Sequence, residues 1–471
     1  MSRELKLIVL LFWTGQITLI LFGQEKYWVH KKDTSLLAGY QPNFCAEWLP
    51  YCSYTLSSPA VPELNKDLRS PLPVVSFKPN KKSNHLKYGF ALEQIEGNLL
   101  FDKGLTGKNI KIGIIDGGFL NADQNLSLSG HFREGRVISY TDYITPELPP
   151  YEGSKHLEDS HGTEVWTLIG GYNPETEVRS GIASEALYHL ARTDHGAFEK
   201  RLEEDLLINA LEDMHKKGIR IVNISLGYAD GYTRKDENYL PMHMDGKTTM
   251  LARAIDSAFF SKNMLVIVSA GNEGDRESWK VLSTPADAQG ALTVGASVLN
   301  GRSRMKFSSI GTPGIGYTKP EIVCFASNGT SFSAPVITGL AAAILQYDTT
   351  LTAREMKELI IKSASLYPYG NNHLGYGVPK VSVLLSLLAG KDVSNNALTI
   401  STNRKSFRVK GINSSKQVFW FHKNHLNEVI KSDSKRIKRG SLKVKPTPAT
   451  RSTSILTGEG NYEIDWDNRG T

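Results

Sequence analysis

The chain has 471 residues, of which 40% are hydrophobic, 41 are glycines and three are cysteines, and its formal net charge is +7. This length excludes one small domain and predicts two or three units, with enough apolar residues for a large core and many tight turns. The positive charge gathers in residues 391–471, but no nucleic-acid recognition motif accompanies it. We therefore expect a solvated basic face and no nucleic-acid partner.

Residues 1–23 resemble a secretory signal peptide. Arg3 and Lys6 precede an apolar run from Leu7 to Phe22. This pattern predicts an export signal with cleavage near Gly23. A membrane anchor is the alternative, but the run is shorter than the roughly 20 apolar residues that span a bilayer. We expect no stable membrane span and a secreted, periplasmic or cell-surface protein.

Residues 24–88 are rich in proline and carry no catalytic string. Cys45 and Cys52 lie close together there, and either a local disulfide or two free thiols fits the sequence. Cys324 has no partner within its own stretch of sequence, and we expect it to act as a small buried hydrophobe.

Strand-like and helix-like segments alternate from about residue 90 to residue 390, which predicts a doubly wound, mostly parallel α/β sheet. The run 110–115 is almost wholly apolar and ends at Asp116, followed by two glycines. Open α/β sheets place their sites at such carboxyl ends, although an aspartate there can also simply make the turn. The expected strands are 110–115, 186–190, 219–224, 265–268 and 291–296, and the expected helices are 203–216 and 248–261.

Ser331 stands in the string Gly-Thr-Ser-Phe-Ser-Ala-Pro, which precedes the apolar run 336–345. The run is apolar on every face and predicts a fully buried helix. Ser331 would then lie at the positive end of a helix dipole, and Pro335 has no N–H to bond to the carbonyl of Ser331. An ordinary helix cap is the plainer interpretation. The string is not the Gly-x-Ser-x-Gly elbow of lipases and esterases.

Two further polar residues stand at the ends of expected elements. His161 follows Asp159 and Ser160, which are natural helix caps, and a helix start favours the neutral imidazole that can act as a base. Asn272 stands in Ala-Gly-Asn-Glu-Gly, where its amide can donate to a developing oxyanion or simply form a turn.

The strings around Asp116, His161, Asn272 and Ser331 resemble, in the same order, the motifs of subtilisin-like serine proteases. The resemblance implies a three-layer α/β/α subtilisin-like fold over residues 89–390. It also implies an exported serine endopeptidase that acts on protein or peptide substrates through an acyl-enzyme. Ser331 would be the nucleophile, His161 the base, Asp116 the residue that orients it, and Asn272 an oxyanion donor.

The same resemblance implies that two backbone segments flank a bound peptide as if it were an added strand. No organic cofactor is expected. Calcium stabilises many members of the family, but no contiguous acidic loop is present, and we predict no metal site. We expect a monomer. The two backbone segments expected to flank a bound peptide consist of Ser225, Leu226 and Gly227 and of Ser269, Ala270 and Gly271.

The chain departs from the family pattern at two places. Glu164 stands where the family usually has a second histidine, and residues 322–327 replace a longer loop near the site. These departures support an alternative, a catalytically silent relative that binds peptides or surface partners. Family members usually carry an inhibitory pro-region where residues 24–88 stand, and residues 391–471 alternate like half-buried strands of a small β module with an accessory or sorting role.

Overall fold

A seven-stranded parallel sheet forms the centre of the molecule, in the order β14-β13-β12-β11-β6-β10-β7. The structure is a computed structural model that describes residues 8–13, 16–21, 24–31, 40–57, 87–152, 157–196, 199–391, 393, 397–410, 417–437, 440–457 and 460–466. The predicted α/β class with a mostly parallel sheet is confirmed. The strands are β6 (Lys111–Asp116), β7 (Val137–Asp142), β10 (Leu187–Arg192), β11 (Ile221–Ile224), β12 (Leu265–Ser269), β13 (Leu292–Ser297) and β14 (Ile322–Phe325).

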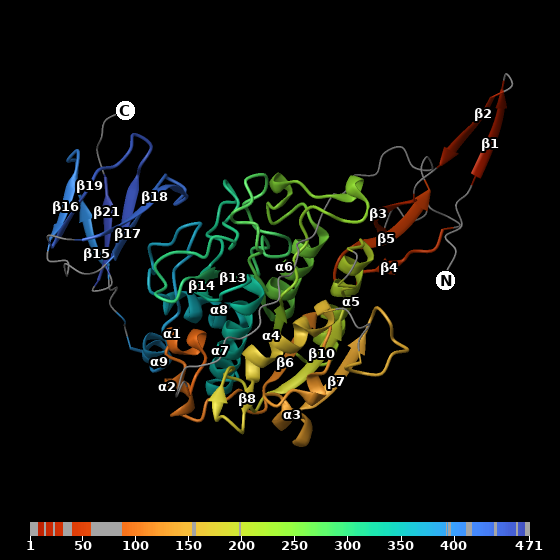
Figure 1. Cartoon of the computed structure of the whole chain (residues 1–471), viewed down its shortest axis with the longest axis horizontal. Helices are drawn as coiled ribbons and strands as arrows, with labels where there is room; N and C mark the ends of the chain where they lie inside the picture. Colours follow the sequence, from red (N-terminus) through yellow and green to blue (C-terminus); the bar gives the residue numbers. More distant parts are fainter. Residues whose placement is uncertain are drawn as a thin grey trace.

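Helices cover both faces of this sheet, because its central strands β6, β11 and β12 carry buried apolar residues on both sides. Ile114 of β6 packs into the core that holds α4 (His161–Gly170), α7 (Ala334–Tyr347) and α8 (Ala353–Lys362). The next residue, Ile115, packs into the core of α5 (Leu202–Lys216) and α6 (Met250–Lys262) on the other face. The result is the expected three-layer arrangement (Figure 1).

Shorter elements complete this part of the chain. The helices are α1 (Phe90–Gln94), α2 (Asn98–Phe101), α3 (Ser129–Arg133) and α9 (Val381–Leu388), and a small ladder joins β8 (Tyr172–Asn173) to β9 (Val178–Arg179). The short 3₁₀ turns are η2 (Ala122–Gln124), η3 (Leu157–Ser160), η4 (Lys235–Glu237), η5 (Pro241–His243) and η6 (Thr330–Phe332).

The order of the strands creates a topological switch beside β6. The chain runs from β6 to β7 and β10 on one side, and then crosses to β11 on the other side. In open α/β sheets, ligands bind in the crevice outside the carboxyl ends of strands at such a point. The ends of β6, β11 and β12 therefore define where a site is expected.

Most of the stretch 322–327, which we expected to replace a longer loop, is a strand. Ile322–Phe325 form the edge strand β14, with Val294 of β13 opposite Ile322. Pairing with the neighbouring strand β13 provides hydrogen-bond partners for the backbone of this apolar segment. Cys324 is fully buried within it, as expected for a small hydrophobe.

The N-terminal region contains two small antiparallel sheets. Strands β1 (Ile8–Trp13) and β2 (Gln16–Leu21) pair with each other, while β3 (Gln24–His30), β5 (Tyr51–Ser57) and β4 (Phe44–Cys45) form a second sheet. Cys45 and Cys52 form a disulfide with an S–S distance of 2.00 Å. The expected signal peptide stays a prediction, and residues 58–86 of the proline-rich segment lie outside the described residues.

The second N-terminal sheet packs against α5 and α6 (Figure 1). Its Lys26 pairs with the buried Asp205 of α5, whose other oxygen accepts a hydrogen bond from Ser53 at 2.7 Å. Glu212 of α5 accepts the backbone N–H groups of residues 47 and 48, both at 2.9 Å. This sheet is therefore joined to the helical layer of α5 and α6 through buried polar contacts.

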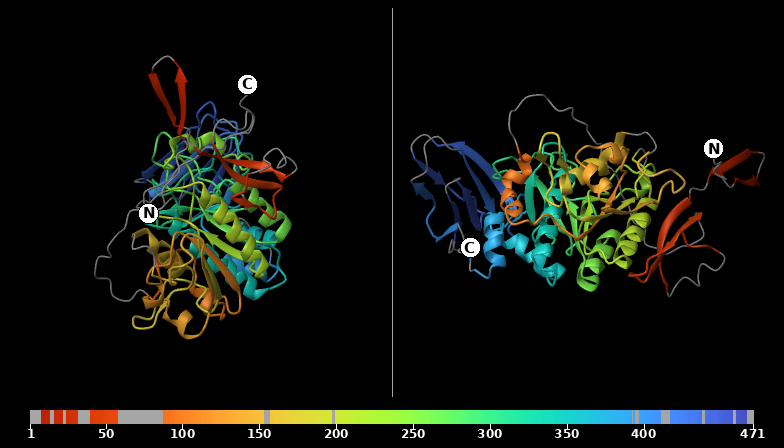
Figure 2. Two further views of the ribbon diagram at one scale, coloured as in Figure 1. Left: turned by 90° about the vertical axis from the view of Figure 1, so that its right-hand side faces the viewer. Right: turned by 90° about the horizontal axis from the view of Figure 1, so that it is seen from below.

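The C-terminal residues form a β module with its own core, at the opposite end of the molecule from β3–β5 (Figure 2, right). A five-stranded sheet runs in the order β15-β21-β20-β17-β18, and β16 pairs with β19. Among the described residues, no helix is long and apolar enough to cross a membrane. The strands are β15 (Ala397–Ser401), β16 (Phe407–Lys410), β17 (Gln417–Lys423), β18 (Val429–Arg436), β19 (Ser441–Val444), β20 (Ser452–Leu456) and β21 (Asn461–Asp465).

Candidate active site

The structure brings Asp116 and His161 into direct contact. Asp116 ends β6 and is fully buried, and its Oδ1 lies 2.6 Å from Nδ1 of His161, the first residue of α4. The same oxygen accepts the backbone N–H of Gly117 at 2.8 Å. A carboxylate in this place fixes the orientation of the imidazole and assigns the proton to Nδ1, which leaves Nε2 as the acceptor.

Two glycines permit this contact. A Cβ on Gly162 would lie 2.4 Å from the carbonyl oxygen of Gly118 and 3.0 Å from Cβ of Asp116, and a Cβ on Gly118 would lie 2.6 Å from the carbonyl oxygen of Asp159. A side chain at position 162 would therefore force α4 away from the end of β6, and one at position 118 would force η3 away. The glycines of both motifs are needed for the close approach of His161.

Arg192, at the end of β10, binds the loops beneath this pair. Its guanidinium donates to Asp142 Oδ2 and Asp159 Oδ1, both at 3.1 Å, and to the carbonyl of Gly117 at 3.0 Å. We expected Asp159 to be a helix cap, but it is fully buried and paired with this arginine. The prediction was wrong because the tertiary ion pair, invisible in the local sequence, decides where the carboxylate lies.

The electrostatic state of His161 also differs from the expectation. Burial acts to lower its pKa, but the adjacent Asp116 carboxylate and its hydrogen bond outweigh burial and raise the pKa above the usual 6.5. We expected the helix start to favour the neutral form. A buried ion-pair partner in direct contact is stronger than a helix end, so the charged form is stabilised instead.

Ser331 lies in the 3₁₀ turn η6, directly before the buried helix α7. Its carbonyl, which Pro335 cannot bond, accepts the hydroxyl of Ser225 at 3.0 Å, while its own Oγ donates to the carbonyl of Ser225 at 3.2 Å. Among the described residues, no hydrogen bond joins Ser331 to His161. Both side chains line the same cavity, and such bonds often form only when a substrate is present.

Asn272 follows the end of β12 with its amide held in one orientation. Its Oδ1 accepts the backbone N–H of Thr330 at 2.8 Å and the Thr330 hydroxyl at 3.1 Å. With the oxygen engaged, the Nδ2 donor is the free end, and Asn272 lines the cavity beside Ser331. The arrangement presents a donor to the space next to the Ser331 side chain.

The cavity holds about 100 Å³ and is lined by five of the six expected peptide-flanking residues. Ala270 lies behind them, fully buried, with its N–H bonded to the carbonyl of Val294 at 3.1 Å. Glu164 is exposed in the first turn of α4 and does not line the cavity. The expected residues that do line it are Ser225, Leu226, Gly227, Ser269 and Gly271.

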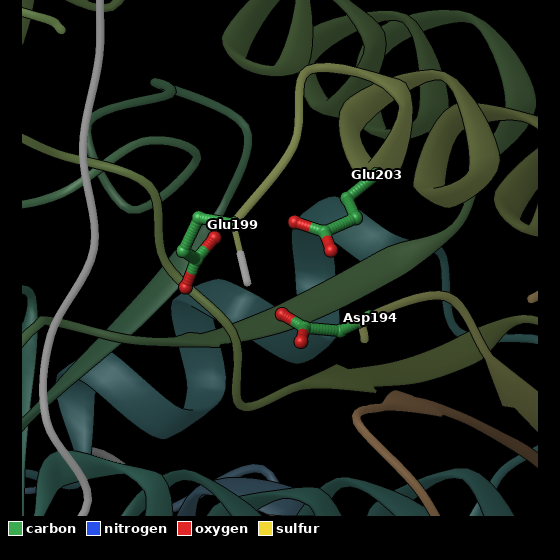
Figure 3. A group of neighbouring side chains, drawn as sticks. All are labelled: Asp194, Glu199 and Glu203. Carbon is green, nitrogen blue, oxygen red and sulfur yellow. The ribbon is translucent and has the colours of Figure 1, made fainter. Parts of the chain in front are cut away.

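Two acidic residues in this cavity were not predicted from the sequence. Asp194 and Glu199 line it between β10 and α5, and with Glu203 they place carboxylate oxygens within 4.8 Å of one another (Figure 3). Their spacing matches no motif that we used. The only available signal was the position of Asp194, two residues after a strand that neighbours β6.

Comparisons with known proteins agree with this geometry. The sequence model of the subtilase family, Peptidase_S8, matches residues 107–377. Subtilisin NAT of Bacillus subtilis subsp. natto is 27% identical over 370 residues, which cover 75% of this chain and 84% of that protein. Subtilisin of Bacillus pumilus is 28% identical over 303 residues, covering 62% and 96%. The CspB protease of Clostridium perfringens shares the fold at a TM-score of 0.50 and 15% identity, covering 64% of this chain and 99% of that chain.

Proposed function

Because this chain belongs to the subtilase family of serine endopeptidases, we propose that it is an exported endopeptidase that cleaves peptide bonds through Ser331, His161 and Asp116. The observation that carries the proposal is the 2.6 Å contact between His161 and the buried Asp116 in the cavity that also holds Ser331. This constellation is the one that activates a serine for acyl transfer.

In the proposed reaction, the Ser331 hydroxyl turns from the Ser225 carbonyl toward Nε2 of His161. His161 accepts its proton as Oγ attacks the scissile carbonyl, and an acyl-enzyme forms while the proton passes to the leaving amine. Water then attacks the acyl-enzyme with His161 again as the base. Asp116 keeps its proton-free carboxylate and stabilises the imidazolium that forms between the steps.

Asn272 would stabilise the oxyanion together with the backbone N–H of Ser331. The support for this role is the engaged Oδ1, since Thr330 holds the amide with its donor end toward the cavity. A donor that is already oriented requires no rearrangement as the negative charge develops. No metal or organic cofactor takes part in this proposal.

Labelling with a fluorophosphonate tests the proposal directly. We expect stoichiometric labelling of Ser331 in the wild type, and neither labelling nor peptide turnover in a folded Ser331→Ala variant. The rival function, a silent relative that binds peptides or surface partners, gains support from the Ser331 hydroxyl, which faces Ser225 instead of His161. A folded wild-type protein that binds peptides but never reacts with the probe would establish that rival and overturn the proposal.

We also propose export through residues 1–23 and removal of residues 24–88 after folding. The apolar run and the position of the second segment before the first catalytic motif support these two steps. The polar contacts of β3–β5 with α5 support the other outcome, in which the disulfide-bonded sheet is a permanent part of the mature fold.

A further inference from the structure

The cavity beside the catalytic pair contains two carboxyl groups that the proposed reaction does not use. Asp194 and Glu199 both line it, together with His161 and Ser331. Only 9% of Asp194 is exposed, and Glu199 has a buried Oε2 with no hydrogen-bond partner among the described residues. The carboxylates point toward one another in Figure 3.

Each of these carboxyl groups disfavours the ionised form of the other. Burial and then Glu203 raise the pKa of Asp194 to about 7, and burial followed by Asp194 and Glu203 raises the pKa of Glu199 well above its usual value. The main charges acting on Glu199 are those of other carboxylates, and the group of described residues formed by Asp194, Glu199 and Glu203 contains no positively charged side chain. A positive charge entering from the cavity would be stabilised by both side chains.

A metal ion is a poorer fit than a basic side chain. Oε1 of Glu203 already accepts Nδ1 of His195 at 2.6 Å and its backbone N–H at 3.1 Å, and Oε2 accepts the N–H of Lys200 at 3.0 Å. Asp194 Oδ1 accepts the N–H of Gly196 at 2.7 Å. Calcium takes about six to eight oxygens, whereas this group has few oxygens that are not already engaged.

An ammonium or guanidinium group needs fewer contacts. The carboxylate oxygens lie within 4.8 Å of one another, and a cation about 2.8 Å from each of two oxygens bridges a gap of up to about 5.6 Å. Resting on the protease function proposed above, we propose that Asp194 and Glu199 bind a lysine or arginine side chain of the substrate close to the scissile bond. The enzyme then selects polypeptides that carry a basic residue there.

The test compares lysine with norleucine, which has nearly the same shape without the charge. Fluorogenic peptides carry one or the other at each of the three positions on either side of a fixed scissile bond. For the full-length wild type we expect kcat/KM to be about 10- to 100-fold higher for lysine at one position, the range of a charge-assisted hydrogen bond. The preference should fall to about one in the double variant Asp194→Asn, Glu199→Gln. The ratio of kcat/KM for the two peptides does not change with any effect of these substitutions on His161, because the cleavage of both peptides depends on His161 equally.

The matched control is Glu358→Gln, an exposed acid of α8 paired with Lys362, which should retain the full preference. Equal kcat/KM for lysine and norleucine at all positions in the wild type overturns the inference, as does a preference that survives the double variant. The group is a metal site instead if three results occur together. Calcium added alone binds in a calorimetric titration, the double variant abolishes that binding, and no lysine preference exists.

Failure of the proposed function is distinguishable from failure of this inference. The inactive Ser331→Ala variant is titrated with the same peptides by fluorescence anisotropy, so that binding is measured without turnover. Tighter binding of the lysine peptide, lost when Asp194 and Glu199 are also replaced, supports the inference even if no peptide is ever cleaved. Equal binding of both peptides rejects it even if the protein is an active protease.

Discussion

Replacing Arg192 by methionine should destabilise the fold by about 3–5 kcal/mol, the cost of leaving buried charges without their partner. Its side chain is 2% exposed, and the carboxylates that it pairs with, Asp142 and Asp159, are 5% and 0% exposed. The variant also leaves the carbonyl of Gly117 without its donor. Methionine fills a similar volume, so the loss reports on charge and not on a cavity.

The assay is urea unfolding near pH 7, with Ser331→Ala in every protein to prevent self-digestion. Burial raises the pKa of Asp142, but two backbone N–H groups and Arg192 reverse this and lower it below 3.8. This contribution to stability is present above pH 3.8 and is lost as the pH falls through the folded-state pKa, so the difference between parent and variant should shrink in acid. Arg133→Met, at a side chain 70% exposed, should change stability by less than about 0.5 kcal/mol. A loss of under about 1 kcal/mol for Arg192→Met would refute the reasoning.

Peptide turnover should decrease as the pH is lowered through a His161 pKa above 6.5, because Asp116 stabilises the protonated imidazole that cannot act as a base. Asp116→Asn should move this limb to lower pH and reduce its maximum, and an activity maximum well below pH 5 would contradict a histidine base. N-terminal sequencing of the secreted, active protein should show a start near the end of residues 24–88 if that segment is removed. A start near the beginning of the segment on fully active enzyme would show that it is retained.

The residues with a local sequence signature were the predictable part of the site. Asp116, His161, Asn272 and Ser331 each follow or precede a strongly patterned element, and the parallel topology brings those elements to one edge of the sheet. The strands and helices were predictable for the same reason, since a fully apolar run or a helical period is written in consecutive residues.

What could not be predicted depends on contacts between distant segments. Asp159 reads as a cap until Arg192 is placed beside it, and Asp194 and Glu199 become a group only when the end of β10 folds against the start of α5. The edge strand β14 was not predicted, because its residues were considered only as part of the stretch that replaces a longer loop. Those residues are apolar, and they pair with β13 at the edge of the sheet.

The hydrogen bond between Ser331 Oγ and the carbonyl of Ser225 has a consequence for the resting enzyme. A peptide that adds as a strand along Ser225–Gly227 must donate its own N–H groups to carbonyls of that segment. The substrate main chain and the nucleophile then compete for one acceptor. In the proposed reaction, a bound peptide that takes this acceptor would thereby favour the turn of the Ser331 hydroxyl toward His161. Recognition of the polypeptide main chain and activation of the serine would then be coupled through one carbonyl oxygen.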